Sequence, residues 1–101
     1  HGNSITATIS SIIPTDYVLL SAYPNPFNPV TAISFELPEA AFVSLKVYDM
    51  NGREIAELVN SELNGGYYTF SWNAIGQSSG IYFVRMITAD FTSSQKLMLI
   101  K

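Results

Sequence analysis

The chain has 101 residues, no cysteine and one histidine, and its five Lys and Arg against eight Asp and Glu give a net charge of −3. This composition excludes disulfides, thiolate chemistry and cysteine-based zinc sites, and it lacks the basic surface of a nucleic-acid-binding domain. Apolar residues make up 48% and charged residues 13% of the sequence, which indicates one compact packed domain rather than a disordered chain.

The first segment is a stretch containing Ser, Thr and Ile, which we interpret as a linker or a remnant of expression over residues 1–16, ahead of a domain over residues 17–101. We expect no signal peptide, because no basic segment followed by an apolar run is present. We also expect no transmembrane segment, because no apolar run reaches the about 18 residues of a membrane helix.

A first strand is expected over residues 17–23, followed by a corner with the sequence Tyr-Pro-Asn-Pro-Phe-Asn-Pro over residues 23–29. Three prolines remove three backbone donors and disfavour helical geometry in the residues before them. We therefore expect a rigid extended corner, with Phe27 packed on the rest of the domain, rather than a recognition surface.

Alternating apolar and polar residues predict the next strands, over residues 30–37 and 43–48. Asn51-Gly52 lies between two strand-like runs and predicts a type I′ hairpin turn, which needs positive φ angles at both central residues. The return strand over residues 53–59 is rich in Glu, so this stretch could also form a helical turn.

Two further turns organise the second half: Asn64-Gly65-Gly66, before an alternating aromatic run over residues 67–72, and Ala89-Asp90, between strands over 81–87 and 91–100. A polar loop is expected over residues 73–80. Seven strands with turn signals about ten residues apart predict an all-β fold, an antiparallel β-sandwich. The expected core consists of Ile33, Phe35, Leu45, Val47, Phe70, Trp72, Tyr82, Val84, Met86, Met98 and Ile100.

Catalytic chemistry is not expected in this chain. The only histidine, His1, lies in the presumed linker, so a Ser-His-Asp or Cys-His site would have to be built on the chain terminus. No glycine motif for nucleotide binding is present. Two pairs of carboxylates, Glu36 with Glu39 and Glu54 with Glu57, are interpreted as solvated charges rather than as a glycosidase pair.

Metal binding is likewise not expected. Asp49 with Asn51, or Asn73 with Asp90, could offer oxygen ligands to calcium, but the sequence has no dense series of Asp and Asn. We therefore predict no enzyme activity, no metal and no cofactor.

Four segments, taken together, resemble one protein family. They are the corner over residues 23–29 with the Ile-x-Phe-x-Leu-Pro strand after it, the hairpin over 43–54, the strand over 79–86 and the tail over 96–101. In this order and spacing they are similar to the type A C-terminal sorting domains of the type IX secretion system (Por secretion), whose fold is immunoglobulin-like. The resemblance runs from Tyr23 to Lys101. Related immunoglobulin-like modules, including one in the flagellar hook-capping protein, share the central pattern.

One turn departs from the family pattern, because members often carry Gly before the last strand where this chain has Ala89-Asp90. Asp tolerates left-handed geometry, so the hairpin is expected to form. The residues that match the family motifs are Pro24, Asn25, Pro26, Phe27, Asn28, Pro29, Gly52, Arg53, Gly80, Tyr82 and Arg85.

The resemblance implies a non-catalytic secretion signal. Such domains follow an N-terminally fused cargo, often a secreted hydrolase or adhesin of Bacteroidetes and their relatives. A separate signal peptide takes the precursor to the periplasm, and the C-terminal domain then directs passage through the outer-membrane translocon to the cell surface or the medium. A sortase-like cysteine peptidase commonly removes the domain and joins the cargo to anionic lipopolysaccharide.

The terminal strand is the expected recognition element. As an edge strand it would present unpaired backbone groups that can add to a partner's sheet. The alternative is an ordinary last strand whose lysines are solvated. We expect Gly80 to permit a tight turn where the loop ends. We expect the Tyr82 hydroxyl to form a hydrogen bond at a corner of the sandwich. The candidate recognition residues are Lys96, Leu97, Met98, Leu99, Ile100 and Lys101.

Two other functions remain open. The Tyr and Trp content motivates a carbohydrate-binding module, but Tyr68, Phe70 and Trp72 alternate on one face and are expected to be buried; Tyr17, Tyr48 and Tyr67 remain possible contacts. The second is an immunoglobulin-like spacer that stabilises an attached hydrolase.

Overall fold

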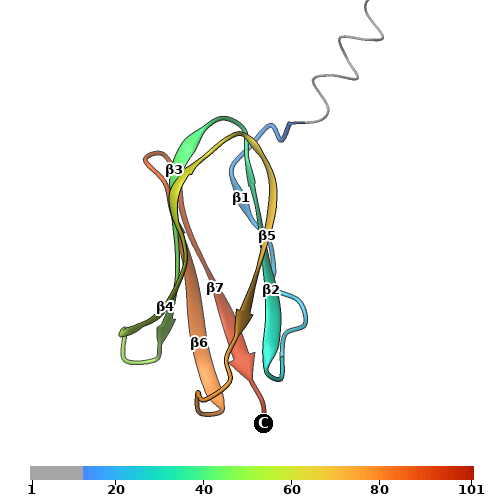
Figure 1. Ribbon diagram of the computed structural model, residues 1–101, viewed down its shortest axis with the longest axis vertical. Coiled ribbons are helices and arrows are strands. Elements are labelled where there is room, and N and C mark those ends of the chain that lie inside the picture. The colour runs from blue at the N-terminus through green and yellow to red at the C-terminus, as the bar shows by residue number, and fades with distance from the viewer. Residues whose placement is uncertain (1–12) are drawn as a thin grey trace, which may run out of the picture.

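The computed structural model describes residues 13–101, which form seven antiparallel strands in two sheets. One sheet has the order β1-β2-β5 and the other β4-β3-β6-β7, and the two face each other as layers (Figure 1). This β-sandwich is the predicted fold class. The described residues contain no helix, and thus none that could cross a membrane. The strands are β1 (Val18–Leu19), β2 (Val30–Leu37), β3 (Ala41–Asp49), β4 (Glu54–Leu63), β5 (Gly66–Asn73), β6 (Gly80–Ile87) and β7 (Thr92–Leu99).

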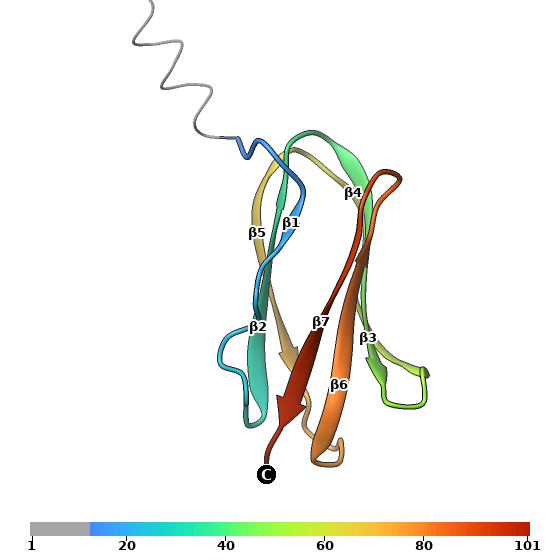
Figure 2. The same cartoon turned by 180° about the vertical axis from the view of Figure 1, so that it is seen from behind.

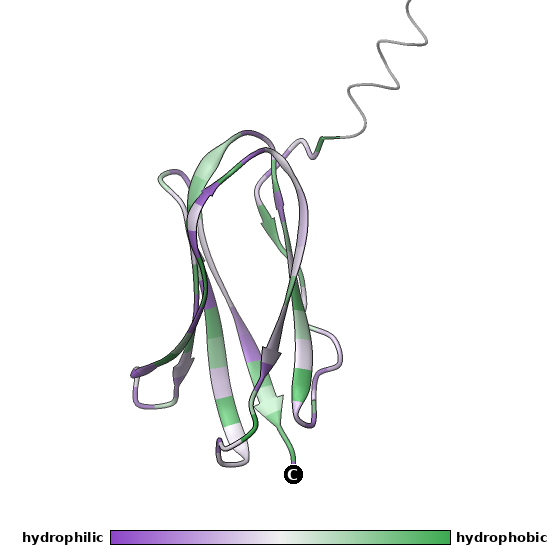
Figure 3. Ribbon diagram, viewed as in Figure 1, coloured by the Kyte–Doolittle hydropathy of each residue, from purple (hydrophilic) through white to green (hydrophobic). Residues whose placement is uncertain are grey.

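The core forms because alternate side chains of each strand point between the sheets. Figure 3 shows this alternation as hydrophobic bands separated by paler residues along β2. Eight of the eleven predicted core residues are buried, and Phe70 is partly buried against them. The eight are Ile33, Phe35, Leu45, Val47, Trp72, Tyr82, Val84 and Met86.

The predicted orientation of the last strand is wrong by one residue. Leu97 and Leu99 are buried, whereas Met98 is 37% and Ile100 50% exposed. Residues 97–100 are all apolar, so they contain no alternation from which to read the inward face. Pairing with β6 decides it: Leu97 lies opposite the buried Tyr82, and directly paired residues share a face of the sheet.

The hairpin between β3 and β4 also differs from the expected type I′ turn. Gly52 N–H donates to Asp49 O and Asp49 N–H to Arg53 O, both at 3.0 Å. Gly52 has φ 84°, and no non-glycine residue among those described has positive φ. This is a three-residue loop with glycine in the left-handed position, so Asn51 keeps ordinary geometry.

The whole of β4 is extended, so this Glu-rich stretch does not form the helical turn that the sequence left as an alternative. Its pairing with β3 shifts register between Leu45 and Lys46 and again between Val47 and Tyr48. Leu58 and Ile55 are the extra residues at these bulges. The bulges interrupt the two-residue period, which explains why the sequence pattern was ambiguous here.

Candidate recognition site at the chain terminus

The proline-rich corner and the terminal strand, far apart in sequence, form one structure. The Asn25 side chain donates from Nδ2 to Lys96 O at 2.8 Å and accepts from Met98 N–H at its Oδ1 at 2.9 Å. A primary amide carries both a donor and an acceptor, so it can take the place of a neighbouring strand's backbone. Asn25 thus pairs with β7 through its side chain.

Phe27 continues this pairing with its own backbone. Its N–H donates to Met98 O at 2.9 Å, and its carbonyl accepts from Ile100 N–H at 3.0 Å, which makes a parallel bridge to Leu99. The Phe27 ring is buried as expected, with its centroid 5.6 Å from that of Trp72. The ring therefore anchors the corner in the core while its backbone holds the strand.

Asn25, Phe27 and residues 96–101 are called the terminal clasp below. β7 is an edge strand of its sheet, as predicted, and Figure 2 shows its end beside the corner that leads into β2. The expectation of unpaired backbone groups is wrong for the last part of this edge, because the clasp uses Lys96 O, both backbone groups of Met98 and Ile100 N–H. One group that pairs with this edge is the Asn25 side chain, about 70 residues earlier in the sequence. Periodicity in the sequence cannot reveal a contact of this kind.

The corner is itself fastened to β2. Tyr23 and Ala32 exchange two backbone hydrogen bonds, of 3.0 and 2.9 Å. The buried Thr31 hydroxyl donates to Pro24 O at 2.7 Å. The peptide bonds that precede Pro24, Pro26 and Pro29 are all cis. The corner is consequently held at both ends, to β2 and to β7.

The loop before β6 supports the other side of the terminal strand. Gly80 pairs with Leu99, and Lys101 N–H donates to Ser79 Oγ at 3.1 Å. The Tyr82 hydroxyl donates to Ser78 O at 2.5 Å, so it is bonded at a loop corner as expected. The chain terminus thus lies between this loop and the proline-rich corner.

The six tail candidates divide into two groups. Leu97 and Leu99 belong to the core, whereas Lys96, Met98, Ile100 and Lys101 are exposed. Only the exposed four are available to a partner of the folded domain.

The remaining motif residues lie near the hairpin between β3 and β4. Gly52 closes its turn, and Arg53 forms a 3.0 Å ion pair with Asp49. The Arg85 guanidinium lies 5.6 Å from the centre of the Tyr48 ring, on the outward face of the four-stranded sheet. The family motifs therefore fall into two places. One is the proline-rich corner and the tail, with Gly80 and Tyr82 beside them, and the other is this hairpin with its adjacent sheet face.

Two charged groups of this region have shifted pKa values. The Asp49 carboxylate accepts from the Arg53 and Asn51 backbone N–H groups and from Arg53 Nε, and the backbone bond from Arg53 contributes most to lowering its pKa. Burial acts in the opposite direction. The hydrogen bond to Glu54 is the main cause that raises the pKa of Lys46.

Neither pair considered for calcium provides an open site. The Asp49 carboxylate is already occupied by its turn and by Arg53. Asn73 and Asp90 lie at opposite ends of the sandwich (Figure 1), so they cannot share an ion. Residues 13–101 bring together no group of three His, Asp or Glu. His1 and most of the presumed linker lie outside the described residues.

The aromatic row of β5 is not an open platform for sugars. Trp72 is buried, and Tyr68 and Phe70 stack on Phe35 with centroids 5.3 and 5.9 Å from its ring. Tyr67 is the well-exposed aromatic residue of this strand, at 60%.

Comparison with known proteins identifies the family. Residues 21–101 match the model of the family described as "Secretion system C-terminal sorting domain", which covers both the corner and the tail. No curated protein sequence matches the chain. Members of the family act in type IX secretion and are exported to the cell surface or the extracellular space. The chain belongs to the C-terminal sorting domains of the type IX secretion system.

Proposed function

We propose that residues 17–101 direct an N-terminally fused cargo across the outer membrane through the type IX translocon, and that the translocon reads the terminal clasp. The observation that carries this proposal is the clasp itself. It joins the first and last family motifs, 71 residues apart at Asn25 and Lys96, into a single surface at the chain terminus. A receptor that bound this surface would require both motifs.

The clasp is read in its folded form. Opening the edge of β7 to a partner strand would break the bonds from Asn25 and Phe27, and the buried Phe27 ring opposes such a movement of the corner. Lys96, Met98, Ile100 and Lys101 are already exposed. Side-chain contacts to these four residues therefore suit recognition better than addition of a strand at this position.

The cargo in this proposal is a hydrolase or adhesin that passes through the periplasm. A sortase-like cysteine peptidase then releases the domain at the surface and attaches the cargo to anionic lipopolysaccharide. The sorting domain acts as the substrate of both machines rather than as a catalyst.

A delivery assay tests the proposal. Residues 17–101 are fused behind a signal peptide and a reporter, and reporter at the surface and in the medium is measured in a host with a type IX system. Replacement of the four exposed tail residues (Lys96→Ala, Met98→Ser, Ile100→Ser and Lys101→Ala) should lower delivery about tenfold, as expected for the loss of contacts worth ~1.4 kcal/mol.

Deletion of residues 96–101 would be a poor substitute, because it also removes the buried Leu97 and Leu99. The matched control carries Tyr67→Ser and Ser71→Ala on the outward face of the other sheet and should be delivered like the parent. A parent fusion that stays in the periplasm would refute the sorting function. Normal delivery of the four-residue variant, with the parent delivered, would refute recognition of the clasp and leave the sorting function standing.

A further inference from the structure

The outward face around Arg85 combines exposed apolar side chains with unpaired cations. Tyr48, Phe83 and Lys96 are direct partners across β3, β6 and β7, and Met98 lies opposite Ile81 in the adjacent row. Phe83 is 37% and Met50 68% exposed. This surface, called the Arg85 face below, consists of Tyr48, Met50, Phe83, Arg85, Lys96 and Met98.

The charges of this face are not balanced within the domain. Lys46, directly opposite Arg85 in the sheet, pairs with Glu54 at 3.2 Å and with Glu57 at 3.9 Å. Arg53 pairs with Asp49 at 3.0 Å. Arg85 and Lys96, by contrast, form no salt bridge with any of residues 13–101. Neither β6 nor β7 contains an Asp or Glu. The part of the face on β6 and β7 therefore carries two cations and no carboxylate, whereas Glu54 and Glu57 lie beside Lys46 on β4. This cationic part is complementary to an acidic partner.

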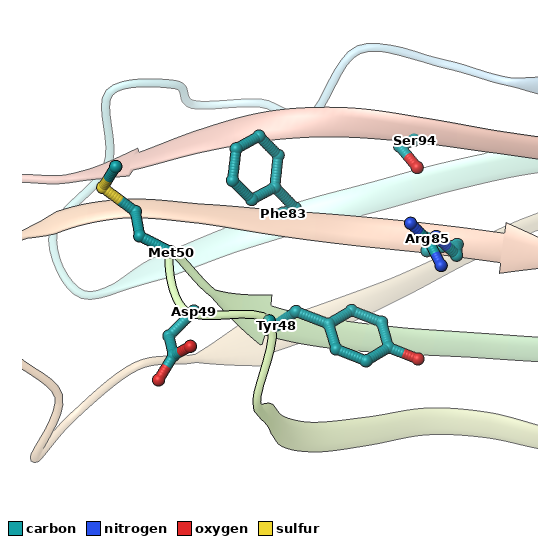
Figure 4. A pocket seen from close by; sticks show the side chains of 7 residues that line it. Tyr48, Asp49, Met50, Phe83, Arg85 and Ser94 are labelled. Carbon is teal, nitrogen blue, oxygen red and sulfur yellow. The ribbon is translucent and has the colours of Figure 1, made fainter.

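The face is also hollowed. A cavity of about 510 Å³ lies between the hairpin and β6, and its lining includes Tyr48, Asp49, Met50, Phe83, Arg85 and Ser94 (Figure 4). The Tyr48 ring positions the Arg85 guanidinium, whose N–H groups make no hydrogen bond within the described part of the chain. The neighbouring Asp49 carboxylate does not neutralise Arg85, because Arg53 and two backbone N–H groups occupy it.

We propose, building on the sorting function above, that the Arg85 face docks an acidic and apolar protein segment of the secretion machinery, with a carboxylate on Arg85 and an apolar side chain in the hollow beside Phe83 and Met50. Arg, Tyr, Phe and Met are the residues enriched at the cores of protein interfaces. The planar guanidinium suits a bidentate pair with a carboxylate. A membrane surface fits less well, because recognition of anionic lipids uses clusters of about four to eight basic residues.

The same delivery assay tests this face with two substitutions. Arg85→Glu places a carboxylate where the partner's carboxylate would bind, and Phe83→Ser removes the apolar wall of the hollow. Each should lower delivery about tenfold. Arg85→Lys keeps the positive charge but loses the planar guanidinium that can donate two parallel hydrogen bonds. The delivery of this variant should therefore lie between those of Arg85→Glu and the parent.

Each substitution has a matched control on the outward face of the other sheet. Tyr67→Glu with Ser71→Glu changes the net charge by the same amount as Arg85→Glu, and Tyr67→Ser removes an exposed aromatic ring as Phe83→Ser does. Both controls should be delivered like the parent. Thermal unfolding of each purified fusion checks that Arg85→Glu remains folded, as expected for an exposed position.

The outcomes separate the two proposals. A delivered parent with equally delivered Arg85→Glu and Phe83→Ser variants would overturn the docking face and leave the sorting function standing. An undelivered parent would remove both. Sedimentation with phosphatidylcholine vesicles, with and without phosphatidylglycerol, tests the lipid alternative: binding of the parent but not of Arg85→Glu to the anionic vesicles would overturn the protein partner, whereas no binding would support it.

Discussion

Asp49 shows how one side chain organises a turn that the sequence pattern attributed to Asn51-Gly52. Its carboxylate accepts from two backbone N–H groups across the loop and pairs with Arg53 Nε. Gly52 is still required, because its φ of 84° lies in the left-handed region. The dipeptide correctly marked the position of the hairpin, and the preceding Asp contributes hydrogen bonds that stabilise it.

The lowered pKa of Asp49 makes a prediction about acid stability. A carboxyl group whose folded pKa lies below its unfolded value of about 3.9 stabilises the fold above that pH, and this contribution disappears as pH falls through the folded pKa. We expect Asp49→Ala to lower the melting temperature at neutral pH. The difference from the parent should shrink as the pH falls below about 4.

Thermal unfolding of both proteins across this pH range measures the effect. Asp49→Asn is the matched control, because its amide oxygen can still accept from the backbone but does not titrate in this range. A difference between parent and Asp49→Ala that is constant from neutral to acid pH would contradict the assignment.

At the scale of elements, the neighbours of the terminal strand determine which of its side chains are buried and which of its backbone groups are paired. β6 determines which face of β7 is buried, and the clasp covers the last part of its outer edge. Closing an edge with a loop is one way in which proteins avoid unwanted strand pairing. Here the same device leaves the outward side chains of β7 as the part of the strand that a partner can reach.

Adjacent substitutions in β7 should therefore have unequal effects. Leu97→Ala removes a fully buried side chain and should lower the free energy of unfolding by about 2–5 kcal/mol. Met98→Ala, at a partly exposed position, should cost less than about 1 kcal/mol. Urea denaturation of the two variants gives both values, and equal losses would contradict the inward face assigned to this strand.

At the scale of the whole molecule, the structural unit begins before the family match. The match starts at residue 21, yet β1 contributes the buried Leu19, and the Gln95 amide donates to Leu19 O at 3.3 Å. Tyr17 stacks on Phe91 with centroids 5.7 Å apart. These contacts place residues 17–19 in the same packed unit as the family match, and Pro14 of the presumed linker is buried as well.

Truncation tests the predicted boundary at residue 17. A fragment of residues 21–101 should be less stable than one of 17–101 by about 2 kcal/mol, the contribution of burying one leucine. Leu19→Ala in the longer fragment should reproduce much of this loss, and Leu20→Ala, at an exposed position, should not. Equal denaturation midpoints for the two fragments would place the boundary at residue 21 instead.

The sequence predicted those parts of the molecule that depend on local pattern. Alternation in β2 and β3 identified the strands and their inward faces, because a two-residue period directly reflects which side of a sheet each residue occupies. Where the period failed, in the apolar run over residues 97–100 and at the bulges of β4, the prediction was wrong or ambiguous. The order of the four motifs was sufficient to indicate the family that the comparison then showed.

The sequence alone thus determined the β-sandwich class and the family of this chain. The fold class follows from local periodicity, and the family follows from the order of short motifs. Only the tertiary structure decided that the corner at Asn25 and Phe27 and the strand ending at Lys101 form one clasp. It also decided that Arg85 and Lys96 share an outward face and form no salt bridge with the described residues. The physical reason is that these relations are made by hydrogen bonds and register between segments distant in the chain. Such contacts leave no period in the sequence, and they determine which side chains a partner can reach.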